Sequence, residues 1–358
     1  MNCDALATLG LDHVEMYVGD VDRHVADYVG SYGFRIAAVS PPQCVSHRSI
    51  ALQQGSIVLV ITQALDAGHP AASFVEVHGD GIADIALRTA DTRAAFAAAI
   101  SRGATALQAP HLVDGLLTAR IRAFGDVVHT LVERVPGETS VAGLPWLVPV
   151  DEYGTEAACG LRAIDHFAVC VGAGDLGAAT RFYEEVLGFA RTLEERIVLG
   201  GQLIDTCGVR NAAGDVTLVL IEPSSEHEPG HIDAFLQRNR GAGVQHLAFI
   251  CDDIVTAVRT LRDRGVLFLH TPDTYYEQLT RRLALPEARV RRLQAHGVLA
   301  DTDSDGQLLQ IFMYSTHPRG TFFHELIERV GGTGFGSRNI RALYESVELA
   351  LGEQTEAL

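Results

Sequence analysis

The sequence predicts an α+β protein of two tandem domains. Each domain is expected to consist of paired βαβββ modules that form a curved, half-open barrel with helices outside. Three observations lead to this prediction: the two halves repeat the same motifs, strand-like and helix-like segments follow each other in the same order, and the strand-like segments alternate inward and outward positions. The 358 residues, 47% of them hydrophobic, are sufficient for more than one core.

The repeat is visible in three pairs of motifs that occur in the same order in both halves. They are LDHVEMYV (11–18) and IDHFAVCV (164–171), GDGIADIAL (79–87) and GAGVQHLAF (241–249), and HTLVERVPG (129–137) and HELIERVGG (324–332). We therefore expect an N-terminal domain at 8–136 and a C-terminal domain at 161–352. The segment 137–160, which is rich in Gly and Pro, is expected to link them.

The elements of the second half each follow from a local pattern. Helices are predicted from apolar residues at helical spacing and from glycines at their ends, and strands from β-branched runs separated by turn residues. In chain order these are a strand at 164–171, a helix at 174–189, β-rich stretches at 197–211 and 215–223, a helix at 231–241, a strand from 244, a helix at 253–265, a helical insertion at 271–295, strands at 307–315 and 321–330, and an amphipathic closing helix at 337–352.

Two histidines and one glutamate of the second half lie inside predicted strands: His166, His246 and Glu325. Two imidazoles and a carboxylate cap one face of an octahedral metal ion and leave the other positions open, which is the ligand set of non-haem Fe(II) oxygenases. The aligned residues of the first half are His13, Asp84 and Thr130. Because this second set is incomplete, we expect the N-terminal domain to be structural.

Strand alternation predicts which side chains share a face. It groups His246 with Val244 and Ala248, and it groups Glu325 with Phe323 and Ile327. His324 faces the other way and is not expected to be a ligand. The histidines outside the trio, among them His24 and His317, are expected at the surface or in loops.

Charge and composition exclude several classes of partner. A net charge of −17 argues against nucleic acid binding, since phosphates are neutralised by an excess of Lys and Arg. Apolar runs such as SIVLVI (56–61) are far shorter than the roughly 20 residues that span a bilayer. No secretory signal follows Met1, so a cytoplasmic protein with reduced cysteines is expected.

The motifs IDHFAVCV, GAGVQHLAF, GQLLQIF, FFHELIERVGG and GFGSRNIRALYESVE resemble the vicinal-oxygen-chelate fold and, within it, the family of 4-hydroxyphenylpyruvate dioxygenase and 4-hydroxymandelate synthase. The resemblance extends over roughly 8–350. It implies that His166, His246 and Glu325 bind Fe(II) and that the substrates are 4-hydroxyphenylpyruvate and O₂. It also implies a set of substrate-lining residues: Thr206, Gln245, Gln310, Phe312, Phe323, Phe335 and Asn339.

The resemblance is closer to the synthases. Dioxygenases of the family show TLPLNEP where this chain reads TLVLIEP, with Val219 and Ile221, and they show Phe where this chain has Ile340. These three residues are expected to surround the aromatic ring. The implied reaction is oxidative decarboxylation followed by benzylic hydroxylation to 4-hydroxymandelate, which by family analogy supplies 4-hydroxyphenylglycine for peptide antibiotic biosynthesis. Thr206, Val219 and His231 depart from the residues common in the family.

Several alternatives stay open at this point. A dioxygenase that forms homogentisate would use the same motifs, a zinc hydrolase would accept the same ligands, and a non-catalytic protein of this fold could bind a small aromatic compound. Gln310 could bind substrate or make a structural hydrogen bond to the backbone. Gln245 points away from the site unless its strand is bent. The oligomeric state, a homodimer included, is not determined by the sequence.

Overall fold

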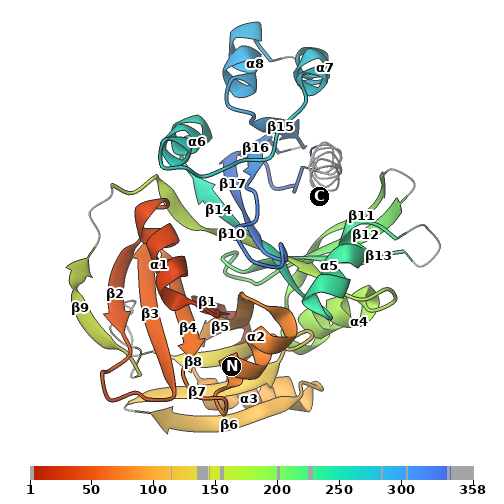
Figure 1. The fold of residues 1–358 in the computed structure, drawn as a ribbon. Coiled ribbons are helices and arrows are strands. Elements are labelled where there is room, and N and C mark those ends of the chain that lie inside the picture. Colours follow the sequence, from red (N-terminus) through yellow and green to blue (C-terminus); the bar gives the residue numbers. More distant parts are fainter. Residues whose placement is uncertain are drawn as a thin grey trace.

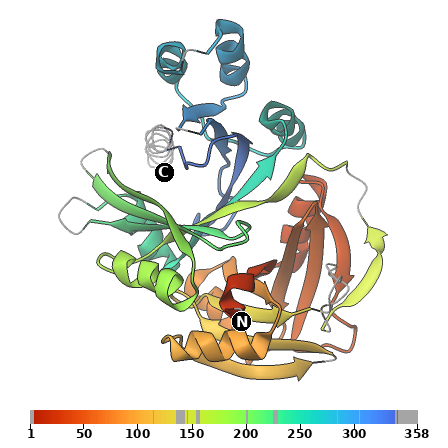
Figure 2. The same ribbon diagram turned by 180° about the vertical axis from the view of Figure 1, so that it is seen from behind.

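The computed structural model describes residues 4–113, 115–134, 144, 146–153, 157–199, 202–224, 229–283, 285–303, 305–336 and 339. Two strongly curved sheets carry helices on their outer faces (Figure 1). The view from behind shows that the sheets lie side by side, with the chain crossing once from one to the other (Figure 2). The predicted fold class is confirmed.

The N-terminal sheet has nine strands in the order β6-β7-β8-β5-β1-β4-β3-β2-β9. The strands are β1 Gly10–Tyr17, β2 Arg35–Val39, β3 His47–Gln54, β4 Ile57–Ala64, β5 Gly81–Thr89, β6 Ala106–Val113, β7 Leu116–Arg122, β8 Val128–Glu133 and β9 Val148–Tyr153. The outer helices are η1 Ala5–Thr8, α1 Val21–Gly30, α2 Pro70–His78 and α3 Thr92–Ser101. Strand β9 pairs with β2, so part of the segment expected to be a linker extends this sheet.

The C-terminal sheet has eight strands in the order β11-β12-β13-β10-β14-β17-β16-β15. The strands are β10 Leu161–Cys170, β11 Ala190–Leu199, β12 Gln202–Arg210, β13 Thr217–Pro223, β14 Gly243–Cys251, β15 Leu299–Thr302, β16 Gln307–Phe312 and β17 Phe323–Val330. The helices are α4 Leu176–Arg181, the π-helix η3 Phe182–Val186, α5 His231–Asn239, α6 Ile254–Asp263, α7 Asp273–Leu283 and α8 Glu287–Gln294.

The two sheets have the same central connectivity. Strand β1 pairs in parallel with β4 and antiparallel with β5, and β5 pairs in parallel with β8. In the second domain β10, β13, β14 and β17 repeat this arrangement. The sequence repeat therefore corresponds to a repeat of strand connectivity. In each domain the three repeated motifs lie on three adjacent strands, β1, β5 and β8 in the first and β10, β14 and β17 in the second.

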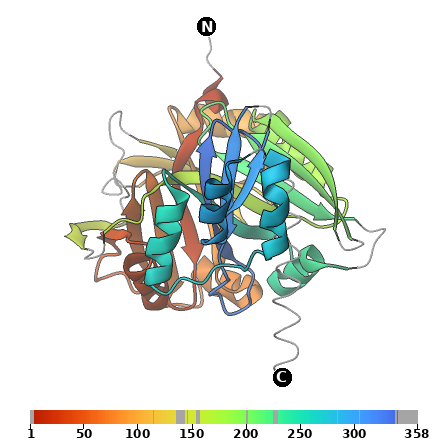
Figure 3. The same cartoon turned by 90° about the horizontal axis from the view of Figure 1, so that it is seen from above.

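Helices α5 and α6 lie within the ranges predicted at 231–241 and 253–265, whereas the helix predicted at 174–189 is α4 followed by η3. Asp20 and Asp253 cap α1 and α6 by accepting hydrogen bonds from backbone amides of the first turn. The insertion expected as one helical stretch is two helices, α7 and α8, because Pro286 cannot continue a helix and precedes the second one. Figure 3 shows them in blue beside the C-terminal sheet. The closing helix predicted at 337–352 lies outside the described residues except for Asn339.

The two domains share one apolar core. The largest cluster of buried apolar side chains contains residues of both halves, and the rings of Phe34 and Phe249 lie 6.2 Å apart across the boundary. His324 lies at the same boundary, where its Nε2 is 2.9 Å from the Tyr28 hydroxyl. His324 therefore faces away from Glu325, as strand alternation predicts. Within the described part of the chain, no helix is long and apolar enough to cross a membrane.

Candidate metal centre

Three adjacent strands of the C-terminal sheet bring His166, His246 and Glu325 together. Strand β10 pairs with β14, and β14 pairs with β17. Glu325 Oε2 lies 3.4 Å from His166 Nε2 and 3.4 Å from His246 Nε2. All three side chains are buried, and their ligand atoms lie within 4.8 Å of one another. The convergence expected from the repeat is therefore present in the structure.

Two bulges in β10 and β14 shape this centre. The ladder between the strands skips Asp165 and Gln245, the residues that precede the two histidines. A bulge inserts one residue and redirects the side chains around it. As a result Gln245 Oε1 comes to 3.4 Å from His246 Nδ1. The bulge also removes Val244 from the alternation that was expected to group it with His246; Val244 packs instead in the shared core.

Asp165 and Arg329 hold the His166 ring. His166 Nδ1 is 2.9 Å from Asp165 Oδ1, and Arg329 donates to both oxygens of that carboxylate at 2.6 and 2.8 Å. Burial opposes ionisation of Asp165, but the hydrogen bonds from Arg329 and His166 outweigh it and keep the pKa of Asp165 well below its usual range. An ionised partner on Nδ1 leaves Nε2 of His166 free to face Glu325.

Glu325 is oriented by a chain of hydrogen bonds that reaches the inserted helices. Gln310 Nε2 donates to Glu325 Oε1 at 2.8 Å, Asn339 Nδ2 donates to Gln310 Oε1 at 2.9 Å, and the Tyr275 hydroxyl donates to Asn339 Oδ1 at 2.7 Å. Arg282 Nη2 donates to the Tyr275 oxygen at 2.9 Å. Gln310 thus bonds two side chains, whereas its structural interpretation expected a bond to the backbone. Its substrate role stays a prediction, and Oε2 is the carboxylate oxygen left toward the histidines.

Aromatic side chains surround the trio. The Phe323 ring stacks on His246 at 4.9 Å and the Phe312 ring lies edge-on to His246 at 6.1 Å. The Phe335 ring lies edge-on to His166 at 5.3 Å. The three phenylalanines expected at the substrate pocket therefore lie against the two histidines.

The other expected pocket residues are on β12 and β13. Val219 and Ile221 are buried in an apolar cluster with Phe335, and Thr206 is paired with Ile221 across the ladder. The Thr206 hydroxyl donates to the Glu195 backbone carbonyl at 3.3 Å. Ile340 lies outside the described residues.

The donor set fits a divalent transition metal ion. Nδ1 of each histidine and Oε1 of Glu325 have neighbouring polar partners, so the atoms that face one another are Nε2, Nε2 and Oε2. Burial lowers the pKa of His246, although Glu325 opposes the shift, and a neutral imidazole is the form that binds a metal. Three ligands on one side leave the opposite positions of an octahedral ion for small molecules.

The sequence analysis does not predict a role at this centre for three residues: Asp165, Arg329 and Tyr275. For two of them a signal was present, because the aligned motifs of the first half contain the same acid before the histidine and the same arginine, Asp12 and Arg134. Tyr275 had no such signal, since the insertion that carries it has no counterpart in the first half.

Comparisons with known proteins identify the family to which the chain is similar. Residues 163–311 match the model of the Glyoxalase/Bleomycin resistance protein/Dioxygenase superfamily, and residues 4–146 match that of the N-terminal domain of hydroxyphenylpyruvate dioxygenase. The chain is 30% identical to 4-hydroxyphenylpyruvate dioxygenase of Yarrowia lipolytica, covering 95% of this chain and 91% of the relative. For the dioxygenase of Caenorhabditis elegans the identity is 32%, with 97% and 92% covered.

Among solved structures, a mutant of 4-hydroxymandelate synthase from Streptomyces coelicolor is similar over 95% of this chain and 98% of its own, with a TM-score of 0.84 and 43% identity. The fold and the site together define a protein of two tandem vicinal-oxygen-chelate domains. More particularly, the chain belongs to the family of 4-hydroxyphenylpyruvate dioxygenase and 4-hydroxymandelate synthase.

Proposed function

We propose that this protein is an Fe(II)-dependent 4-hydroxymandelate synthase. It converts 4-hydroxyphenylpyruvate and O₂ into 4-hydroxymandelate and CO₂, with one oxygen atom entering the new carboxylate and the other the benzylic hydroxyl. His166, His246 and Glu325 hold the iron. Bound Fe(II) supplies the activation of O₂ that is coupled to decarboxylation of the keto acid.

The observation that carries the choice of product is the apolar face beside the centre. Val219 and Ile221 are each 6% exposed and pack with Phe335, whose ring touches that of His166. A polar residue at position 221 would offer the phenol a hydrogen bond, whereas isoleucine offers only a surface to pack against. A shift of about 1 Å in ring position is sufficient to change reactivity, so these side chains favour attack at the benzylic carbon over attack at the ring.

The remaining residues position and enclose the substrate. Phe312 and Phe323 lie against His246 and exclude water from that side of the centre. The Asp165–Arg329 pair keeps the His166 ring in one orientation, and Gln310 does the same for Glu325. The similarity to a 4-hydroxymandelate synthase over nearly the whole chain supports the same assignment.

The test is product analysis. Protein loaded anaerobically with Fe(II) is mixed with 4-hydroxyphenylpyruvate and O₂, and the products are compared with standards by chromatography and proton NMR, because 4-hydroxymandelate and homogentisate are isomers of equal mass. The proposal expects the benzylic CH–OH signal. Homogentisate would establish the runner-up, the dioxygenase, and an absence of O₂ consumption would favour a binding protein or a zinc hydrolase.

A matched pair of variants tests the role of the apolar face. Ile221→Asn combined with Ile340→Phe is expected to move product toward homogentisate, since both changes restore the residues of the dioxygenases. Ile340→Phe alone serves as the control, and iron content must match that of the parent protein. An unchanged product ratio in the double variant would contradict this account.

A further inference from the structure

A second cluster of metal-ligating side chains lies at the boundary between the domains. His24 belongs to α1, Asp80 precedes β5, and His317 belongs to the loop between β16 and β17. Their ligand atoms lie within 4.8 Å of one another. His24 Nε2 is 2.9 Å from Asp80 Oδ2, and the His24 and His317 rings are 4.9 Å apart. Both histidines are buried. The expected surface or loop position is wrong for His24, which lies on a helix, whereas His317 does lie in a loop.

His317 has an unused polar atom in this cluster. Its side chain is 7% exposed, and Nδ1 has no hydrogen-bond partner within the described part of the chain. A buried polar atom of this kind costs about 1–3 kcal/mol unless a partner satisfies it. A neutral imidazole nitrogen without a partner carries a lone pair that a metal ion can accept.

Asp80 is already ionised and fixed. Its Oδ1 accepts a hydrogen bond from the Gly19 amide at 2.8 Å, which leaves Oδ2 toward the histidines. Two imidazoles and one carboxylate thus meet at one point, as they do in the candidate iron centre.

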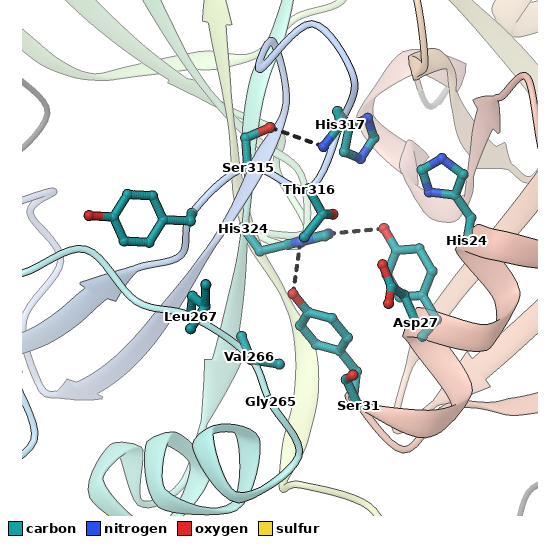
Figure 4. Close-up of a pocket in the computed structure, with 13 residues that line it drawn as sticks. His24, Asp27, Ser31, Gly265, Val266, Leu267, Ser315, Thr316, His317 and His324 are labelled. Atoms are coloured by element: carbon teal, nitrogen blue, oxygen red, sulfur yellow. Dashed lines mark hydrogen bonds between the residues drawn. The ribbon is translucent and has the colours of Figure 1, made fainter. Parts of the chain in front are cut away.

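The His317 loop is held in place by the N-terminal domain. Arg23 Nη2 donates to the Thr316 carbonyl at 2.6 Å, and Arg319 donates to the carbonyls of Val77 and Glu76. Figure 4 shows His24 on its helix facing His317 on the loop. A cavity of about 160 Å³ adjoins both rings, which is room for water molecules as additional ligands.

We propose that His24, Asp80 and His317 form a second metal site, which binds a divalent ion of the zinc type and ties the two domains together. Zn²⁺ accepts imidazole and carboxylate ligands at about 2.0–2.2 Å and is commonly four-coordinate, so the three side chains and one water complete its shell. The ion replaces the His24–Asp80 hydrogen bond and gives the buried His317 nitrogen a partner.

The test is zinc stoichiometry in the full chain. Protein stripped with a chelator is dialysed against Zn²⁺ and its zinc content is measured by elemental analysis, with thermal unfolding followed in parallel. The intact protein is expected to bind two ions, since the trio also accepts zinc. His317→Ala is expected to bind one ion and to lose part of the rise in Tm caused by zinc. His270→Ala, which removes an exposed histidine, should behave like the parent protein.

Two milder variants keep the test decisive if His317→Ala folds poorly. Asp80→Asn and His24→Gln preserve side-chain volume and hydrogen bonding but weaken the ligand set, so each should also bind one ion. Glu325→Gln should lose the other ion, and combining it with Asp80→Asn should leave none. Zinc content that is equal in the parent and in all three boundary variants would overturn the proposal, as would a single ion that only Glu325→Gln removes.

Discussion

In the C-terminal domain, two imidazoles and a carboxylate direct three ligand atoms at one point. In the N-terminal domain the matching strands carry His13, Asp84 and Thr130, but Asp84 is hydrogen-bonded to Thr130 and the His13 ring to Asp12. Thr130 donates to Asp84 from its amide at 3.0 Å and also from its hydroxyl. The comparison shows how one fold carries a candidate metal centre in one copy and a hydrogen-bonded Asp84–Thr130 pair in the other.

Arg120 explains much of the difference. It is paired with Thr130 across the ladder, as Phe312 is paired with Glu325 in the other domain. Its Nη2 lies 3.4 Å from Asp84 Oδ2. A guanidinium therefore neutralises the buried carboxylate of the N-terminal domain. At the equivalent place, the C-terminal domain has an aromatic ring that leaves Glu325 to face the histidines.

The support of the first histidine is common to both domains. Asp12 lies 2.7 Å from His13 Nδ1 and accepts from Arg134 at 2.6 and 2.8 Å, as Asp165 does with His166 and Arg329. The ladder skips Asp12 as it skips Asp165. The contacts between aspartate, histidine and arginine are present in both domains, although the ligand set of the N-terminal domain is incomplete. They therefore have a structural role that does not depend on a metal: they join β1 to the end of β8, and β10 to β17.

The largest effect is expected from removing the carboxylate that only one domain provides. Glu325→Gln should abolish iron binding and lower turnover at least about 1000-fold, which corresponds to about 4 kcal/mol. The matched change Thr130→Val should leave iron content and turnover unchanged. Iron analysis and O₂ uptake measure both. Stoichiometric iron in Glu325→Gln would refute the assigned ligand set.

The next effect is on stability and belongs to the N-terminal domain. Arg120→Met leaves the buried Asp84 without its cation, which should lower the free energy of unfolding by about 3 kcal/mol. Iron content should not change, since this network is separate from the candidate centre. Urea unfolding monitored by circular dichroism gives the value. A variant as stable as the parent protein would show that Arg120 does not stabilise the buried Asp84 carboxylate.

Asp165→Asn and Asp12→Asn form a matched pair. Loss of the Asp165 charge should weaken Fe(II) binding about 10–100-fold, because partners of ligand histidines orient the ring and raise its basicity. Asp12→Asn should leave Fe(II) affinity unchanged. Anaerobic titration against a competing chelator measures both. Equal affinities in the two variants would place the effect in general stability and not in ligand orientation.

A smaller effect is expected in the pH dependence of the unfolding free energy, which tests the contribution of Asp12 in the N-terminal domain. Burial opposes ionisation of Asp12, but hydrogen bonds from Arg134 and His13 hold its pKa well below its usual range. A lowered folded pKa stabilises the protein above the ordinary value of about 3.9, and that contribution is lost as pH falls below it. From pH 6 to pH 3, Asp12→Asn should lose roughly 1 kcal/mol less unfolding free energy than the parent. Parallel pH profiles would exclude this contribution.

The smallest effect tests the link from the inserted helices. Tyr275→Phe removes the donor to Asn339 and should lower kcat/KM by roughly 2- to 10-fold, the value of one hydrogen bond of about 0.5–1.5 kcal/mol. Tyr276→Phe, on the same helix but outside the chain of hydrogen bonds, is the control. If both variants are equally active, orientation of Glu325 does not depend on this link.

The sequence predicted the tandem domains, their strands and the trio, because the repeat aligns positions that any common fold must superpose. It could not predict that Gln245 would turn toward His246, since a bulge is a property of strand pairing and leaves little trace in one segment. Nor could it place His24 beside His317, because a contact between two domains depends on how they dock. Glu325 is predicted as a ligand from the repeat. Its hydrogen-bonded link to Tyr275 could not be predicted, because Tyr275 lies in an insertion that has no counterpart in the first half.

The most direct test is anomalous diffraction at the iron edge from crystals loaded anaerobically with Fe(II). The account predicts a peak between His166 Nε2, His246 Nε2 and Glu325 Oε2, and no peak beside His13, Asp84 and Thr130. An empty position at the trio, or iron in the N-terminal network, would contradict it.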